Sequence, residues 1–177
     1  MSIEQLKYPI GKFVAQNSYS PTELSGFINR LDVFPEKLNR AVSGLTDKQI
    51  DTPYREEGWT VRQVVHHLAD SHTNAYIRFK WTLTEESPTI KVYNEKLWAE
   101  TPETKLALNI SIDLIRPLHS KFVALLSSLS STDWTKQFFH PESKQYIQLD
   151  RMAALYAWHG EHHVAHITEL RKRMNWN

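Results

Sequence analysis

Apolar residues recur at three- and four-residue steps in four long stretches of the chain, the spacing expected of helices that bury one face. Mostly short or medium links separate these stretches, which favours an all-α fold, an antiparallel four-helix bundle. The 177 residues are enough for a substantial core, and no internal repeat divides them, so we expect one domain over 1–177. The predicted helices cover about 21–43, 60–87, 103–129 and 149–174.

Residues at the starts of these stretches have the pattern of helix caps. Ser20 and Thr60 are each followed three residues later by Glu or Gln, so each can form a capping box. Asp150 is the candidate cap of the last helix. Pro35 and Pro117 fall inside the first and third helices, where each predicts a kink or a break.

The remaining segments carry weaker signals. Residues 1–19 show no sustained period, and we expect an extended segment packed along the body rather than a regular element. Residues 89–101 read as a loop or a short extended run. Before the last helix, aromatic and β-branched residues in 134–140 and 145–149 flank a turn, which predicts a small β-hairpin.

Composition narrows the class of protein. A formal net charge of +1 gives no reason to expect nucleic acid or an anionic membrane as partner. No run of about 18 apolar residues is present, and the first residues lack the apolar core of a signal peptide, so we expect a cytoplasmic protein. The absence of cysteine excludes disulfides, zinc–thiolate sites and a cysteine nucleophile. No glycine-rich dinucleotide or phosphate loop occurs.

The last predicted helix contains a cluster of histidines. His159 and His163 lie four residues apart and within roughly 40° of the centre of the apolar stripe, so their side chains are neighbours. A buried neutral imidazole needs a partner for each ring nitrogen, and one cation would serve both. From this helix alone, metal ligands and hydrogen-bonded core histidines both remain open. Gly160 stands where a zinc metalloprotease would carry glutamate, which argues against that class.

The second predicted helix offers a third ligand without identifying it. His66 and His67 flank its apolar stripe on opposite sides, and His72 lies within it. The spacing does not decide which of them meets a metal. His67 shares its flank with Ser71, Asn74 and Arg78, and this polar lane is slightly more typical of a solvated helix face than of a pocket wall.

Two blocks of sequence, TPYREEGWTVRQVVHHLADSH (52–72) and LYAWHGEHHVAHITEL (155–170), resemble the DinB/YfiT-like family, in particular its YfiT-type bacterial members. The segments YPIGKF and FFHPE look like the same group, so the resemblance spans nearly the whole chain. It implies a four-helix bundle and one divalent metal ion per chain, zinc or nickel. The ligands implied by the matching motifs are His67, His159 and His163. The resemblance also implies a metal-dependent hydrolase or a thiol S-transferase using a thiol such as bacillithiol, and a homodimer.

Three functions are therefore open. A bound ion can activate a small thiol for attack on an electrophile, which is the leading hypothesis, or activate water for hydrolysis. A bundle stabilised by metal without turnover is the third. The expected partner is a small-molecule substrate. Asp70, Glu161 and His166 are weaker candidates for residues that orient the ligands, and no catalytic residue is assigned.

Overall fold

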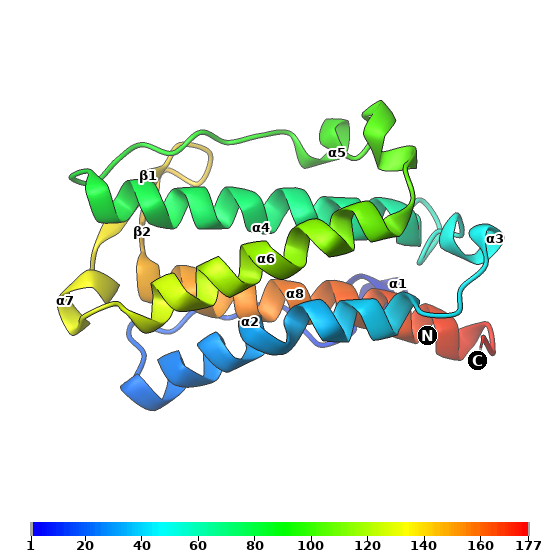
Figure 1. Cartoon of the computed structure of the whole chain (residues 1–177), viewed down its shortest axis with the longest axis horizontal. Helices are drawn as coiled ribbons and strands as arrows, with labels where there is room; N and C mark the ends of the chain where they lie inside the picture. The colour runs from blue at the N-terminus through cyan, green and yellow to red at the C-terminus, as the bar shows by residue number, and fades with distance from the viewer. Residues whose placement is uncertain (1, 177) are drawn as a thin grey trace.

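A computed structural model describes residues 2–176 of the chain. Four long helices dominate it, which confirms the expected four-helix bundle (Figure 1). They are α2 (Pro21–Val42), α4 (Val61–Thr84), α6 (Leu108–Ser127) and α8 (Leu149–Arg173).

Two of the four helices run each way. In Figure 1, α2 and α8 run from left to right, whereas α4 and α6 run from right to left. The helix pairs α2–α8 and α4–α6 are therefore parallel neighbours, and α2–α6 and α4–α8 are antiparallel neighbours. A parallel pair needs a connection that returns along the bundle. Residues 85–107 make that return between α4 and α6, and they contain α5 (Glu95–Trp98) and the 3-10 turn η1 (Pro102–Lys105).

The capping boxes form as the sequence predicts. The Ser20 and Thr60 hydroxyls accept from the backbone N–H of Glu23 and Gln63, whose side chains accept from the cap N–H groups in return. The prediction for Asp150 is wrong, because the cap position is Gln148, two residues earlier, and α8 begins at Leu149.

The start of α8 is set by the hairpin before it. The Leu149 N–H donates to the Lys136 carbonyl at 3.0 Å, so the first turn is held by backbone and not by a cap side chain. The hairpin itself is confirmed. Strand β1 (Gln137–His140) pairs antiparallel with β2 (Gln145–Gln148).

The start of the third helix differs from the prediction of about 103. Residues 102–105 form η1 instead, and α6 begins at Leu108. Leu106 between them is extended, with φ −66° and ψ 168°. Its carbonyl accepts from Arg62 Nη1 at 3.0 Å and from a ring nitrogen of His66 at 3.2 Å, and these contacts with α4 hold the break. Neither Pro35 nor Pro117 ends its helix.

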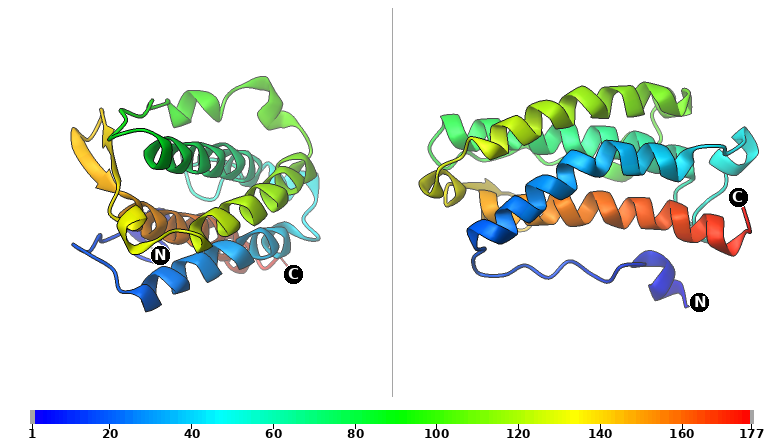
Figure 2. Two further views of the ribbon diagram at one scale, coloured as in Figure 1. Left: turned by 60° about the vertical axis from the view of Figure 1, so that its left-hand side comes forward. Right: turned by 60° about the horizontal axis from the view of Figure 1, so that its bottom comes forward.

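Residues 3–7 were not expected to form an element, yet they make a short helix, α1 (Ile3–Lys7). The reason is local: Ser2 and Gln5 form a capping box. The chain that follows is extended and runs beside α8 back to the start of α2 (Figure 2). Two further single turns, α3 (Asp47–Ile50) and α7 (Ser131–Trp134), join the long elements.

The apolar core has two clusters that follow each other along the bundle. One contains Val61, Val65 and Leu68 of α4, and the other contains Phe79 and residues of the hairpin. On α4 and α8 the interval between the clusters is occupied by histidines. The polar centre of the molecule is therefore enclosed by core on both sides along the bundle axis.

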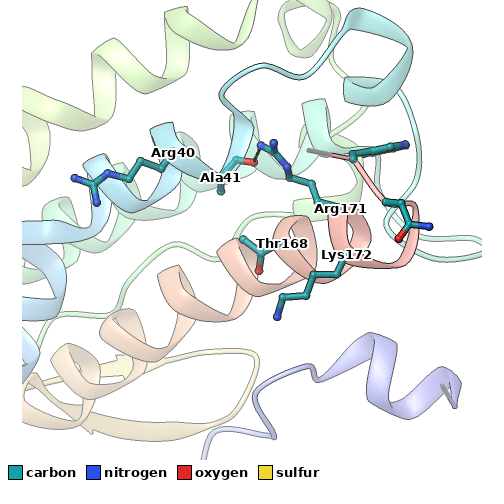
Figure 3. A pocket seen from close by; sticks show the side chains of 7 residues that line it. Arg40, Ala41, Thr168, Arg171 and Lys172 are labelled. Carbon is teal, nitrogen blue, oxygen red and sulfur yellow. Dashed lines mark hydrogen bonds between the residues drawn. The ribbon is translucent and has the colours of Figure 1, made fainter.

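The C-terminal ends of the parallel helices α2 and α8 are tied together. Arg171 Nη1 donates to the Ala41 carbonyl at 3.0 Å (Figure 3). It also donates to the Ser43 carbonyl at 2.8 Å, and the two contacts satisfy orphan carbonyls at the end of α2. Across residues 2–176, none of the helices has both the length and the apolar character needed to cross a membrane.

Candidate metal centre

Three histidines from two helices meet close to the junction of the two core clusters. His67 comes from α4, and His159 and His163 come from α8. One ring nitrogen of each lies within 4.8 Å of the other two, and the Nε2 atoms of His67 and His159 are 3.3 Å apart. These are the three residues that the family resemblance implies.

The donor set suits a divalent ion. Two imidazole nitrogens bound to zinc at about 2.0–2.1 Å in tetrahedral geometry are roughly 3.3–3.4 Å apart. The observed separation of 3.3 Å between His67 and His159 agrees with that value. Burial lowers the pKa of His67 to about 4 and the pKa values of His159 and His163 well below the usual range. All three rings are therefore neutral at pH 7, which is the form that binds metal.

The neighbouring His66 points elsewhere. Its ring nitrogens lie 2.7 Å from the Ser111 hydroxyl and 3.2 Å from the Leu106 carbonyl, both on the α6 side. Helical spacing places His66 and His67 on equivalent flanks, so only the packing of α6 against one flank and α8 against the other distinguishes them.

A chain of imidazoles supports His159 from behind. Its Nδ1 lies 3.4 Å from His72 Nε2, and His72 Nδ1 lies 3.0 Å from His119 Nε2. The chain ends where His119 Nδ1 lies 2.7 Å from the Leu31 carbonyl. Because a carbonyl only accepts, His119 carries its proton on Nδ1, and the same logic puts the protons of His72 and His159 on Nδ1. The Nε2 lone pair of His159 is thus directed at His67.

Pro35 makes the end of this chain available. In an uninterrupted helix the Leu31 carbonyl would accept the N–H of residue 35, but proline has none. The free carbonyl accepts from His119 of α6 instead. The proline that the sequence marks as a helix disruptor therefore provides an acceptor for the polar centre.

His163 has a shorter support of the same kind. Its Nδ1 lies 3.4 Å from His166 Nδ1, and His166 Nε2 lies 3.0 Å from the Lys7 carbonyl at the end of α1. His166 therefore donates from Nε2 to the carbonyl and accepts from His163 on Nδ1, which leaves His163 Nε2 free of a proton. Both α8 histidines are oriented by another histidine anchored on backbone.

Two aromatic residues pack around this network. The Trp59 ring centroid lies 4.7 Å from that of His67 and 6.3 Å from that of His163. Phe34 stacks on His72, with ring centroids 4.8 Å apart and planes within 5°. Gly160 makes this possible, because a Cβ at that position would lie 2.7 Å from a Phe34 ring carbon.

Of the three weaker candidates for orienting residues, only one contacts the three-histidine cluster in the described part of the chain. His166 does contact one of the three histidines, as expected of an orienting residue. Glu161 instead pairs with Arg30 at 2.6 Å and Lys37 at 3.1 Å on α2, away from the cluster. Asp70 is half-buried, and burial raises its pKa to about 6, but it has no recorded contact with the three rings among residues 2–176. The sequence offered His72 only as one of three possible ligands and gave His119 no role, because spacing along one helix does not show that the two rings contact each other.

Two cavities reach the cluster from different sides. The larger, about 940 Å³, is lined by His163 and Trp59 and by charged residues of both signs. The smaller, about 340 Å³, is lined by His159 and by Ser71 and Arg78 of α4. Ser71 and Arg78 are buried, so the expectation that the lane beside His67 is a solvated face is wrong for these two positions.

Comparisons with known proteins agree with this architecture. The profile of the DinB superfamily matches residues 30–167. A Bacillus subtilis protein named "Putative metal-dependent hydrolase YfiT" is 48% identical over 178 residues, covering 100% of both chains. A Bacillus cereus (strain 03BB102) protein named "Putative metal-dependent hydrolase" is 49% identical over 174 residues, or 98% of this chain and all of the relative.

Among solved structures, that of YfiT from Bacillus subtilis superposes with a TM-score of 0.96 at 49% identity. The match covers 98% of this chain and 99% of that one, which is described as a "probable metal-dependent hydrolase with an unusual four-helix bundle topology". Both the profile match and the two full-length relatives cover far more than half of the chain. The chain belongs to the DinB superfamily.

Proposed function

We propose that His67, His159 and His163 together hold one divalent metal ion, zinc or nickel, and that the protein is an enzyme that uses it to activate a small thiol for transfer to an electrophile. Three imidazoles leave an open coordination position, at which a bound thiol is deprotonated and a water molecule has its pKa lowered to about 7. The network of histidines behind the ligands supports the first half of this proposal, since it directs their Nε2 atoms toward one point.

The observation that carries the transfer reaction is the pair of cavities. A transferase must hold two reactants beside one reactive centre, whereas hydrolysis needs one organic substrate and water. The large cavity touches the cluster at His163 and the small one at His159, and Glu95 lines both, so two neighbouring cavities meet the cluster at different histidines. Because the chain has no cysteine, the attacking sulfur must belong to a substrate.

The residues around the cluster have separate tasks in this proposal. Trp59 covers His67 and His163 and limits the access of bulk water. His72 and His166 hold protons on the Nδ1 atoms of His159 and His163, which keeps the metal-facing nitrogens basic. The mixed charges of the large cavity suit a polar thiol such as bacillithiol, and the more apolar small cavity suits the electrophile.

The alternative is hydrolysis of an ester, amide or similar bond. The names of the relatives support it, since they describe metal-dependent hydrolases. The same open position would then serve water.

One experiment separates the two functions. Zinc- and nickel-loaded protein is compared with chelator-treated protein, first for conjugation of small thiols to a chromogenic electrophile and then for ester cleavage without thiol. We expect metal-dependent conjugation that disappears in His159→Ala. Equal conjugation with and without metal rejects the transferase, and metal-dependent cleavage without thiol establishes the hydrolase. His66→Ala is the matched control, because His66 is a buried histidine of α4 outside the cluster.

We also propose that the protein is a homodimer, as the family resemblance implies. From its net charge and the lack of a long apolar run, we propose that it is cytoplasmic, without nucleic acid or membrane partners. Sedimentation of purified protein at micromolar concentration tests the dimer. A single species with the mass of one 20.7 kDa chain would contradict it.

A further inference from the structure

The small cavity beside His159 has one polar and one apolar wall. Phe138 and Ile147 of the hairpin and Met152 of α8 form the apolar wall. Ser71 and Arg78 belong to the polar wall, so the space suits a molecule with an apolar body and one strongly polar end.

Arg78 is the unusual member of the polar wall. It is only 9% exposed, yet no carboxylate of residues 2–176 lies within 4.0 Å of its guanidinium. Its recorded hydrogen bond is from Nη2 to the Lys91 carbonyl at 3.3 Å, and its Nε is buried without a partner in the described part of the chain. A guanidinium is always charged and has five N–H donors. Arg78 therefore keeps unused donors in a site where unpaired charge is costly.

Hydroxyl groups gather beside this guanidinium. Ser71 Oγ donates to the Tyr156 hydroxyl at 3.5 Å, and both residues are buried and line the same cavity. The Tyr93 ring lies 6.0 Å from the guanidinium carbon, and its hydroxyl is buried without a partner among residues 2–176. The Tyr156 hydroxyl accepts in that hydrogen bond and keeps its own proton, so it can donate to an anion in the cavity, as the guanidinium can.

The cavity favours one negative charge over two. Among the described residues that line it, Arg78 is the one lysine or arginine, and burial lowers the pKa of His140, which also lines it. A phosphate dianion would leave a net negative charge in a mostly apolar space, whereas a carboxylate is neutralised by one guanidinium. Glu95 lines the cavity as well, but burial raises the pKa of its carboxyl, which favours the neutral form that leaves the charge of Arg78 uncompensated.

Arg78 is also correctly placed to hold a molecule that reaches the histidine cluster. It lies eleven residues after His67 on α4, or about 16 Å along the helix axis. Its side chain leans back toward the N-terminus of the helix, and so toward His67. The cavity extends from Arg78 to His159.

We infer that Arg78 is a binding residue for the carboxylate of an elongated, largely apolar small molecule whose other end reacts at the three-histidine cluster. This inference rests on the proposed function for the reacting end only. The carboxylate contact depends on Arg78, Ser71 and Tyr156 and not on the histidines.

Two probes that differ only in the anion test the inference. The dissociation constants of 6-chlorohexanoate and 6-chlorohexanol, two electrophiles for the small cavity, are measured by calorimetry on zinc-loaded full-length protein without thiol. A charge-assisted hydrogen bond in a buried site predicts that the acid binds at least about tenfold more tightly than the alcohol. In Arg78→Gln we expect this preference to disappear with little change in the affinity of the alcohol. Arg78→Lys should restore part of it, because lysine keeps the charge without the planar fork.

Arg55→Gln is the matched control, since Arg55 lines the large cavity instead. It should leave the preference intact. An acid that binds no more tightly than the alcohol in the wild type overturns the inference, and so does a preference that survives Arg78→Gln or is lost in Arg55→Gln. If the acid binds through Arg78 but metal-loaded protein does not conjugate it to a thiol, the inference stands and the thiol-activating function fails.

Discussion

Replacing His72 with phenylalanine tests whether the imidazole chain behind His159 supports metal binding. Phenylalanine retains the ring that stacks on Phe34 but removes both nitrogens. His159 Nδ1 then loses its acceptor and His119 Nε2 loses its donor. A buried polar group left without a partner costs about 1–3 kcal/mol, so the loss in unfolding free energy should be about 2–6 kcal/mol.

The same substitution should also weaken metal affinity, and this effect can be measured independently of the loss in unfolding free energy. Loss of the partner that orients a histidine ligand weakens metal binding by about 10- to 100-fold. His72 is not among the ligands that the family resemblance implies, so the resemblance alone predicts no change in metal content on its substitution. With His72 against His159, we expect one ion per chain at saturating metal but a weaker affinity. Urea unfolding of the metal-free protein and competition with a chromogenic chelator measure the two quantities.

His66→Phe is the control for this prediction. His66 is also buried on α4 and also has partners for both ring nitrogens, but these face α6. It should lose a similar amount of stability and keep its metal affinity. An unchanged affinity in His72→Phe, or an equal loss in both variants, would refute the role given to the chain.

Three further predictions follow from the same centre. His159→Ala should abolish stoichiometric metal binding, because two imidazoles make a weak site; one ion per chain by elemental analysis would contradict this. In Pro35→Ala the N–H of the new alanine can donate to the Leu31 carbonyl, which should stabilise α2. The same bond takes that carbonyl from His119 and should weaken metal affinity. Chemical unfolding should therefore show a higher stability and chelator competition a lower metal affinity. The metal-free protein should lose stability as pH falls below about 6.5, the unfolded histidine pKa. Burial lowers the folded pKa of all nine histidines, most strongly for seven of them, and unfolding takes up protons on these seven. At about pH 5.5 each of the seven histidines lowers the unfolding free energy by roughly 1.4 kcal/mol, and together they lower it by on the order of 10 kcal/mol. Unfolding should therefore occur between about pH 5 and 6. An unfolding free energy that is constant over this range would exclude the neutral buried cluster.

Periodicity and capping chemistry predict the local structure well. The helix starts at Ser20 and Thr60 and the hairpin before α8 were predictable because their signals lie within a few residues. The start of α6 was not, since the extended backbone at Leu106 is held by Arg62 and His66 from another helix. Which helices run parallel is likewise a tertiary property.

The site shows the same division between local and tertiary information. The pair His159 and His163 follows from helical spacing, and the resemblance adds His67. Spacing misjudged Arg78 as solvated, because a helix flank is exposed or buried according to what packs on it, here the hairpin and the connection after α4. His119 could not be anticipated, since its partner is a carbonyl made free by a proline 84 positions earlier in the chain.

The contact of His166 with the Lys7 carbonyl has a practical consequence. Terminal residues are usually the safest part of a protein to trim or to fuse. Here the Lys7 carbonyl at the end of α1 orients His166, which in turn orients His163. A deletion or bulky fusion at residues 1–7 would therefore weaken metal affinity while leaving the four long helices intact.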